Sequence, residues 1–480
     1  MSYEFRITGK KRLFKFIKQF VILNSSFIIL FSSCSIEKQI SKSAQADVLS
    51  TKALLAAHVG ISIFDPAENK YLYNYQGDKY FVPASNTKIP TCYAAMKYLG
   101  DSLVGLRYFS KNDSNVIILP TGDPTFLHED YRYQPILKYL QNERSKIFIE
   151  IKNWKEEPLG SGWSWNDYNE SYMAERSSLP AFGNLVKISL LGRPIRGKYN
   201  LVFKPLYFGR HNEDFMIGLI NTPSRHIVWA DSTPANFVLK RVKEKNQFYL
   251  AESNTIFNSQ KIPFTVDTIT TVLKVLKEDF GIFITPLKKS LLVDDADKSQ
   301  IFKMFTNQIH SQPTDSLLKP MMHRSDNFFA EQSLLMVSNE MLGVMNDAKI
   351  IDTILKTDFK DLPQKPRWAD GSGLSRYNLF TPQDFVAILN KMKNEFGMDR
   401  IKVIFPTGGE GTISSYYKAD SGYIYAKTGT LSGVVAFSGY LYTKKGKLLL
   451  FSTLVNNHQA SATDVRRAVE KFLQGVRNKY

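Results

Sequence analysis

The most informative stretch of this chain is PASNTK at residues 83–88, which runs into a segment with helical spacing from Thr87 to Leu99. Residues three apart at the start of a helix share a face, so the amine of Lys88 can reach the hydroxyl of Ser85. A serine hydroxyl becomes a competent nucleophile only when a neighbouring base takes its proton. The stretch therefore predicts a nucleophile, Ser85, paired with a base, Lys88.

Two further motifs follow downstream. SDN at residues 325–327 places a hydroxyl and a carboxamide two positions apart on a short loop, where both can face one cavity. KTG at residues 427–429 occurs once and precedes a strong strand, and its glycine lets a substrate backbone approach closely. Ser-x-x-Lys recurs elsewhere, for example at residues 316–319, so the prediction depends on the ordered combination of the motifs.

The two ends of the chain have the patterns of one domain. Residues 58–64 and 70–75 predict a strand pair around a turn, and residues 434–442 and 448–456 predict a hairpin. Apolar residues at helical spacing from 462 to 476 predict a final helix. The middle of the chain is rich in aromatic residues and short mixed runs, which indicates a mostly β insertion.

The composition excludes little by itself. The chain has 480 residues and a formal net charge of +17. Its basic residues form no dense run after the first twenty residues, so we expect no nucleic-acid partner. An anionic envelope polymer or a substrate that ends in a carboxylate explains the charge equally well. The sequence has no His-Glu-x-x-His, cysteine cluster or phosphate loop, so we expect neither a metal nor a cofactor.

The beginning of the chain has the pattern of an export signal. Basic residues between Lys10 and Lys18 precede an apolar run from Phe20 to Phe31, which is too short for a comfortable membrane span. Small residues then lead to Cys34, as in the lipobox of bacterial lipoproteins. We expect a signal peptide over 1–33, a lipid on Cys34 that anchors the protein to the membrane on the periplasmic side of the cell envelope, and a polar tether over 34–47. A plain signal peptide or an uncleaved anchor is the alternative.

Taken together, the motifs resemble the penicillin-binding-protein and serine β-lactamase superfamily. The chain is most similar to the D-Ala-D-Ala carboxypeptidases/endopeptidases of the penicillin-binding protein 4 type, peptidase family S13. The strings that carry this resemblance are PASNTK at 83–88, GDPT at 122–125, SDN at 325–327 with Ala330-Glu331, DGSGLSR at 370–376, Gly411-Thr412, KTGTL at 427–431 and Ser438-Gly439-Tyr440.

The resemblance implies an α/β fold in which helices flank an antiparallel five-stranded sheet. Residues 48–120 and 290–480 are then expected to form the catalytic domain, and residues 121–289 the mostly β insertion. The implied activity is that of a serine-type D-Ala-D-Ala carboxypeptidase, with or without endopeptidase activity, on peptidoglycan stem peptides. β-Lactams are the implied covalent inhibitors.

The resemblance also implies roles for individual residues. The implied catalytic residues are Ser85, Lys88, Ser325, Asn327 and Lys427. The implied substrate-binding residues are Thr428, Gly429, Thr430, Asp123 and Arg376. Ser85 attacks the carbonyl of the penultimate D-Ala, and Ser325 passes a proton to the departing D-Ala. The neutral form of Lys88 acts as base, with its pKa lowered by burial and by the charge of Lys427. For Asp123 and Arg376, a turn-forming aspartate and a structural arginine fit the sequence as well.

Two alternatives remain open from the sequence. An esterase or a β-lactamase on the same fold would share the serine and lysine but release a different leaving group. A non-catalytic wall-binding lipoprotein would keep the fold without turnover. No Glu-x-x-Leu-Asn string lies between Ser325 and Lys427, so we expect slow rather than rapid hydrolysis of penicillins.

Overall fold

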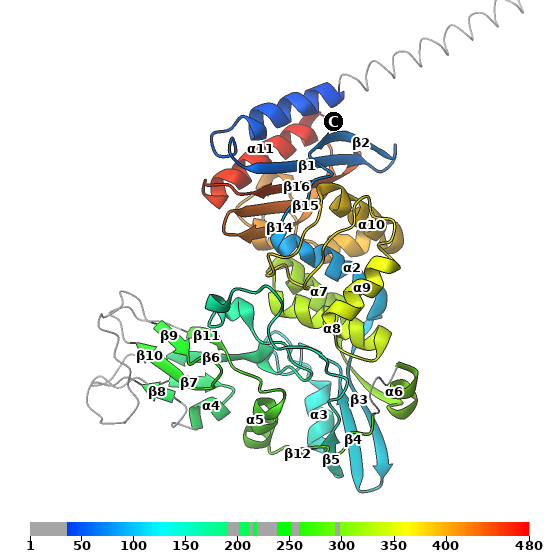
Figure 1. Ribbon diagram of the computed structural model, residues 1–480, viewed down its shortest axis with the longest axis vertical. Helices are drawn as coiled ribbons and strands as arrows, with labels where there is room; N and C mark the ends of the chain where they lie inside the picture. Colours follow the sequence, from blue (N-terminus) through cyan, green and yellow to red (C-terminus); the bar gives the residue numbers. More distant parts are fainter. Residues whose placement is uncertain are drawn as a thin grey trace, which may run out of the picture.

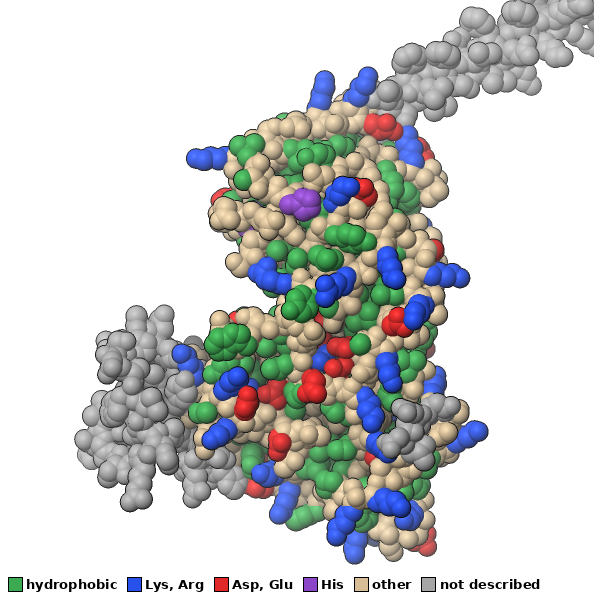
Figure 2. All heavy atoms as spheres, in the orientation of Figure 1, with side chains coloured by type: hydrophobic (Ala, Val, Ile, Leu, Met, Phe, Trp, Pro, Cys, Tyr) green, Lys and Arg blue, Asp and Glu red, His purple; other side chains and the backbone are tan. Residues whose placement is uncertain are grey.

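The computed structural model describes residues 36–190, 201–210, 215–217, 238–251, 259–292 and 298–479. The expected signal peptide and Cys34 lie outside these residues. Figure 1 shows two bodies stacked along the longest axis. The first body, which contains the strands at both ends of the chain, lies above. The second body, which contains most of the middle of the chain, lies below. Figure 2 shows the outline hollowed between them, and Lys and Arg side chains scattered over the visible face without gathering in one patch of the described surface.

The first body is built on an antiparallel five-stranded sheet, which confirms the predicted fold class. Its order is β14-β15-β16-β1-β2, so strands from both ends of the chain pair side by side. The bounds are β1 His58–Asp65, β2 Lys70–Tyr75, β14 Ile424–Leu431, β15 Val434–Tyr442 and β16 Leu448–Asn456. The predicted strand pair and hairpin are both confirmed.

The alternation of side chains along β15 explains the layers on either face of this sheet. Val435 and Phe437 face the core beneath α11 (Ala462–Lys479), the predicted final helix. Ala436 and Tyr440 face the other core, which is filled by helices. These helices are α2 Lys88–Tyr98, α7 Thr314–His323, α8 Asn327–Leu342, α9 Asp347–Lys356 and α10 Pro382–Ile404. Because both faces are covered, the strands carry near-continuous apolar runs.

The second body contains a mixed five-stranded sheet of order β12-β5-β4-β3-β13. Its strands are β3 Ser102–Asn112, β4 Asn115–Pro120, β5 Lys146–Ile149, β12 Ile284–Pro286 and β13 Asn307–Pro313, with helices α3 Pro135–Asn142, α5 Thr270–Phe280 and α6 Lys298–Met304. The expected domain boundaries at 120 and 290 are therefore wrong, because β3, β4 and β13 lie in this sheet. Strand patterns show that a segment is extended, but they do not show which sheet it joins.

Two three-stranded sheets extend the second body, which agrees with a mostly β middle. Their orders are β11-β6-β7 and β8-β10-β9. The bounds are β6 Leu185–Leu190, β7 Leu201–Lys204, β8 Phe215–Ile217, β9 Val238–Arg241, β10 Phe248–Ala251 and β11 Ser259–Pro263, beside a short helix α4 at Tyr207–Arg210.

The segment expected to be a tether is packed against the first body instead. Residues 36–44 are helical and continue into a π-helical turn, η1, at Gln45–Leu49. Ile40, Ala44 and Val48 repeat every four residues and are buried in the core beneath α11. This sparse apolar stripe, hidden among polar residues, explains why the segment appeared unstructured in the sequence. Within the described residues, no helix has the length and apolar character needed to cross a membrane.

Candidate active site

Ser85 and Lys88 lie where the sheet meets the helices. Ser85 belongs to a 3-10 turn, η2, at Ala84–Thr87, which leads directly into α2 at Lys88. The Nζ atom of Lys88 donates a hydrogen bond of 3.0 Å to the Oγ atom of Ser85. Ser85 is half-buried, whereas Lys88 is completely buried. The hydroxyl can therefore meet a substrate while the amine is kept from bulk water.

Lys88 has two further partners, both carbonyl oxygens. Its Nζ atom donates to Oδ1 of Asn327 at 2.6 Å and to the backbone oxygen of Ser372 at 2.7 Å. The Nδ2 group of Asn327 donates in turn to the backbone oxygen of Tyr172 at 3.0 Å. The amide of Asn327 is therefore oriented with its oxygen toward Lys88.

Lys427 contacts the second serine of the site. Its Nζ atom lies 2.8 Å from Oγ of Ser325 and 2.7 Å from the backbone oxygen of Thr428. Ser325 has a φ of 60°, an uncommon conformation for a residue other than glycine. The Oγ1 atom of Thr428 pairs with Oγ1 of Thr412 at 2.7 Å. The three motifs thus meet through the contacts of two lysines.

Burial controls the charge of both lysines. It lowers the pKa of Lys88 from its ordinary value to about 8, against the opposing pull of three nearby carboxyl groups, those of Asp370, Glu331 and Asp326. The pKa of Lys427 is also lowered, first by burial and then by the positive charge of Lys88. The sequence predicts that the charge of Lys427 lowers the pKa of Lys88, whereas in the structure the charge of Lys88 lowers the pKa of Lys427.

Thr430 and Gly429 continue the strand beyond Lys427. Thr430 is exposed, and its Oγ1 atom accepts a hydrogen bond of 2.6 Å from Arg466. Position 429 needs a glycine, because a Cβ atom there would lie 2.6 Å from the backbone oxygen of Pro83. The sequence explains this glycine by the close approach of a substrate, but in the structure the turn that carries Ser85 also lies against it. Strand β14 is the edge of the first sheet: its outer backbone bonds Pro406 at Ala426 and lies beside the turn of Ser85 at Gly429.

Asp123 and Arg376 are not brought into contact with this cluster. Asp123 is buried in the second body, where Oδ1 accepts hydrogen bonds from the backbone and hydroxyl of Thr125. That contact fits the turn-forming alternative. Arg376 is exposed and donates to the backbone oxygen of Ser432, just beyond β14, at 2.9 Å.

Several residues of this site lie in the strings that carry the family resemblance, but the sequence assigned them no role. Ser372 lies in the DGSGLSR string, Thr412 follows Gly411, and Glu331 follows Ala330. Each contacts one of the motif residues or supports a residue that does. Tyr172, which contacts Asn327, had no sequence signal at all.

Solved structures show which class of fold this is. A crystal structure of penicillin binding protein 4 (dacB) from Haemophilus influenzae matches with a TM-score of 0.66, covering 92% of this chain and 98% of that chain at 20% identity. A structure of the same protein complexed with a novel β-lactam matches with a TM-score of 0.60 at 20% identity. The fold is therefore that of a penicillin-binding protein.

The family follows from the sequence comparison. The pattern of the D-Ala-D-Ala carboxypeptidase 3 (S13) family matches residues 41–476, and the chain belongs to this family. D-alanyl-D-alanine carboxypeptidase DacB of Haemophilus influenzae is 24% identical over 90% of this chain and 92% of its own length. A D-alanyl-D-alanine carboxypeptidase of an Actinomadura species is 24% identical over 86% of this chain and 80% of its own length.

Proposed function

We propose that this serine-type D-Ala-D-Ala carboxypeptidase removes the terminal D-Ala of peptidoglycan stem peptides through an acyl-enzyme on Ser85. The observation that carries the proposal is the 3.0 Å contact between Ser85 Oγ and the completely buried amine of Lys88, whose pKa is lowered to about 8. An ordinary lysine, with a pKa of about 10.4, would hold its proton at neutral pH.

The first half-reaction forms the acyl-enzyme. Ser85 Oγ attacks the carbonyl carbon of the penultimate D-Ala while Lys88 Nζ takes the hydroxyl proton. The carbonyl oxygen becomes an oxyanion, which the backbone N–H groups of Ser85 and Thr430 stabilise in the proposed mechanism. When the tetrahedral intermediate collapses, the C–N bond breaks, and the proton that Lys88 took passes through the hydroxyl of Ser325 to the departing amine of D-Ala. Lys88 is then neutral again in the acyl-enzyme. The contact of Ser325 with Lys427 supports this relay.

The second half-reaction returns the enzyme to its starting state. A water molecule attacks the ester carbonyl, and Lys88 removes one of its protons. The ester C–O bond then breaks, and Ser85 regains its hydroxyl proton. The products are the shortened stem peptide with a new carboxylate and the free serine side chain.

Recognition of the free carboxylate is assigned to the KTG strand. The amine of Lys427 and the hydroxyl of Thr428 supply the donors. Both are held at the edge strand β14, with Thr412 fixing the Thr428 side chain. Burial and Lys88 lower the pKa of Lys427, and a substrate carboxylate beside it opposes that shift and favours the charged amine. Arg376 and the exposed Thr430 lie near the end of the same strand and are proposed to contact the peptide stem. We assign no substrate contact to Asp123, since its carboxylate is engaged in a buried turn.

The proposed location is the periplasmic side of the cell envelope, with a lipid on Cys34 as the anchor. The basic residues between Lys10 and Lys18, the apolar run and the small residues before Cys34 support it. Metabolic labelling with a radioactive fatty acid tests the anchor. Label in the wild-type protein that is lost in Cys34→Ser supports it, and an unlabelled wild-type protein contradicts it.

Digestion of a muropeptide that carries a pentapeptide stem tests the activity. We expect stoichiometric release of D-Ala by the wild type and none by Ser85→Ala. Cross-linked muropeptide dimers digested in parallel show whether the same acyl-enzyme also cleaves cross-links. Rapid nitrocefin turnover without D-Ala release would favour the β-lactamase alternative, and D-Ala release by Ser85→Ala would contradict the proposal.

A further inference from the structure

Beneath the site lies a charged cluster that is largely buried. Arg176 is 1% exposed and pairs with Asp347 at 2.6 Å, Glu156 at 3.1 Å and Glu331 at 3.5 Å. Glu331, on α8, is also 1% exposed. Buried charges of this kind are costly to desolvate and are weak evidence for stability, so their presence beside a reactive centre calls for another explanation.

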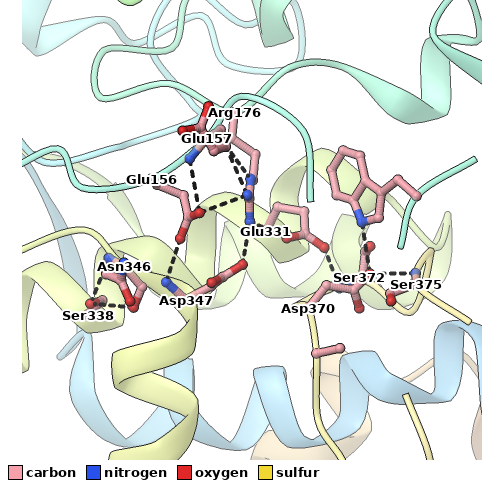
Figure 3. Close-up of polar contacts among 12 residues, drawn as sticks. Glu156, Glu157, Arg176, Glu331, Ser338, Asn346, Asp347, Asp370, Ser372 and Ser375 are labelled. Atoms are coloured by element: carbon pink, nitrogen blue, oxygen red, sulfur yellow. Dashed lines mark hydrogen bonds and ion pairs between the residues drawn. The ribbon is translucent and has the colours of Figure 1, made fainter. Parts of the chain in front are cut away.

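The cluster reaches Lys88 through the backbone of one residue, Ser372. The carboxylate of Glu331 accepts a hydrogen bond of 2.7 Å from the backbone N–H of Ser372. The backbone oxygen of the same residue accepts the 2.7 Å hydrogen bond from Lys88. Figure 3 shows Glu331 between Arg176 and Ser372, with Asp370 beside Ser372.

The loop that holds Ser372 has little freedom to move. Asp370 accepts hydrogen bonds from the backbone N–H groups of Gly373 and Ser375, and from Trp163 at 3.0 Å. A Cβ atom on Gly373 would lie 1.9 Å from the backbone oxygen of Ala84, so the loop presses on the turn that carries the nucleophile. The position of the Ser372 oxygen relative to Lys88 is therefore set by buried carboxylates.

That position determines where the lone pair of the base points. A neutral amine has two N–H bonds and one lone pair, whereas the ammonium form has three donors and no lone pair. The two carbonyl oxygens that contact Lys88 can only accept, so they take both N–H bonds of the neutral amine. The lone pair is then left for the third partner, the hydroxyl of Ser85.

We propose that Glu331, held by Arg176, is a positioning residue of the reaction: it fixes the Ser372 carbonyl that directs the Nζ lone pair of Lys88 at Ser85. This inference rests on the proposed roles of Ser85 and Lys88. Glu331 acts on the reaction through the backbone of Ser372 and is assigned no contact with substrate. Arg176 comes from the second body, so part of the support for the base is supplied by the insertion.

Glu331 also acts through its charge, and the sign of that effect can be tested. The groups facing Lys88 are Glu331 and Asp326 from α8 and its cap, Asp370 from the DGSGLSR loop, and Lys427 from β14. An ionised Glu331 stabilises the ammonium form of Lys88 and so raises the pKa of that lysine. Burial and the neighbouring Asp370 raise the pKa of Glu331 itself to about 8, so its negative charge develops over the same pH range in which Lys88 loses its proton. The isosteric Glu331→Gln removes this attraction but keeps an acceptor for Ser372. It should allow Lys88 to lose its proton at lower pH.

The test is the second-order rate constant for acylation by a fluorescent penicillin, measured against pH. For Glu331→Gln we expect the acid limb to shift to lower pH, by an amount set by the fraction of Glu331 that is ionised there, with a plateau close to that of the wild type. An unshifted acid limb would overturn the charge effect of Glu331 on Lys88. Glu340→Gln, on the same helix but paired with Arg107 at 2.6 Å, is the matched control and should leave the profile unchanged.

A second variant separates position from charge. Glu331→Asp keeps the carboxylate but withdraws it from Ser372, so the plateau should fall by about tenfold or more while the acid limb stays in place. A wild-type plateau in this variant overturns the positioning role, even if Glu331→Gln does not fold. If the proposed roles of Ser85 and Lys88 are wrong, the wild type itself is not acylated, whereas failure of this inference leaves the wild type acylated and the variants unchanged.

Discussion

The Nζ atom of Lys88 lies 3.0 Å from the Oγ atom of Ser85, because the chain changes from a 3-10 turn to an α-helix between these two residues. The serine stays at the surface of the site, and the lysine enters the core. The same short stretch thus supplies an accessible nucleophile and a desolvated base. Most of the predictions below depend on this pairing.

Acylation should depend on the protonation of Lys88. Its pKa is lowered to about 8, and only the neutral amine can accept the serine proton. The rate constant for acylation by a penicillin should therefore rise with pH through this value, and it should be abolished at all pH values in Lys88→Arg, whose guanidinium keeps its proton. A rate that is flat or falling through the same range would contradict the assignment.

Gly373 should be essential because of what lies next to it. Gly373→Ala places a methyl group 1.9 Å from the backbone oxygen of Ala84, so the turn of Ser85 must shift and acylation should fall by about a hundredfold. Gly446→Ala is the matched control, because that glycine also has a positive φ but no atom within 4 Å of the added carbon. Both variants pay about 1 to 2 kcal/mol for the backbone conformation. Equal acylation rates in the two would show that the contact is unimportant.

Lys427 should make the enzyme selective for a free carboxylate. The wild type is expected to cleave a peptide that ends in D-Ala-D-Ala carboxylate far better than the same peptide with a terminal amide. In Lys427→Gln, kcat/KM for the carboxylate should fall by about tenfold or more, since a charge-assisted contact is lost, and the preference should shrink. Measuring kcat/KM for both peptides checks this, and an undiminished preference in the variant would assign carboxylate recognition elsewhere.

The N-terminal helix should contribute to the stability of the first body. Ile40 is 3% exposed, so Ile40→Ala should lower the free energy of unfolding by about 2 to 4 kcal/mol. Lys42→Ala, two residues later on the exposed side, should leave it within about 0.5 kcal/mol of the wild type. Denaturant unfolding measures both. Equal stability of the two variants would restore the tether interpretation.

The motifs and the first sheet could be predicted from the sequence because their signals are local. The residue types of PASNTK and KTG, and the alternation along residues 434–442, are readable without knowing the rest of the fold. The residues that hold Lys88 in place could not be predicted in this way, because they are distant from it in the sequence. Ser372 is 284 positions away from Lys88, and Arg176 is 155 positions away from Glu331. No local pattern pairs residues at such separations.

The wrong predictions, of the domain boundaries and of the tether, also arise because tertiary contacts leave no local signal in the sequence. Strands β3 and β13 are ordinary extended segments, and only their pairing places them in the second sheet. The helix over residues 36–44 has a stripe of apolar residues too sparse to stand out, yet the groove beside α11 buries it. The pKa of Lys88 depends on burial and on carboxylates from distant segments, so its cause could be only partly anticipated.

The assignment of Ser85 as nucleophile is best tested by mass spectrometry after incubation with a labelled penicillin. We expect one covalent adduct, located by peptide mapping on Ser85 and absent in Ser85→Ala. An intact wild-type protein without an adduct, or an adduct on any other residue, would contradict it.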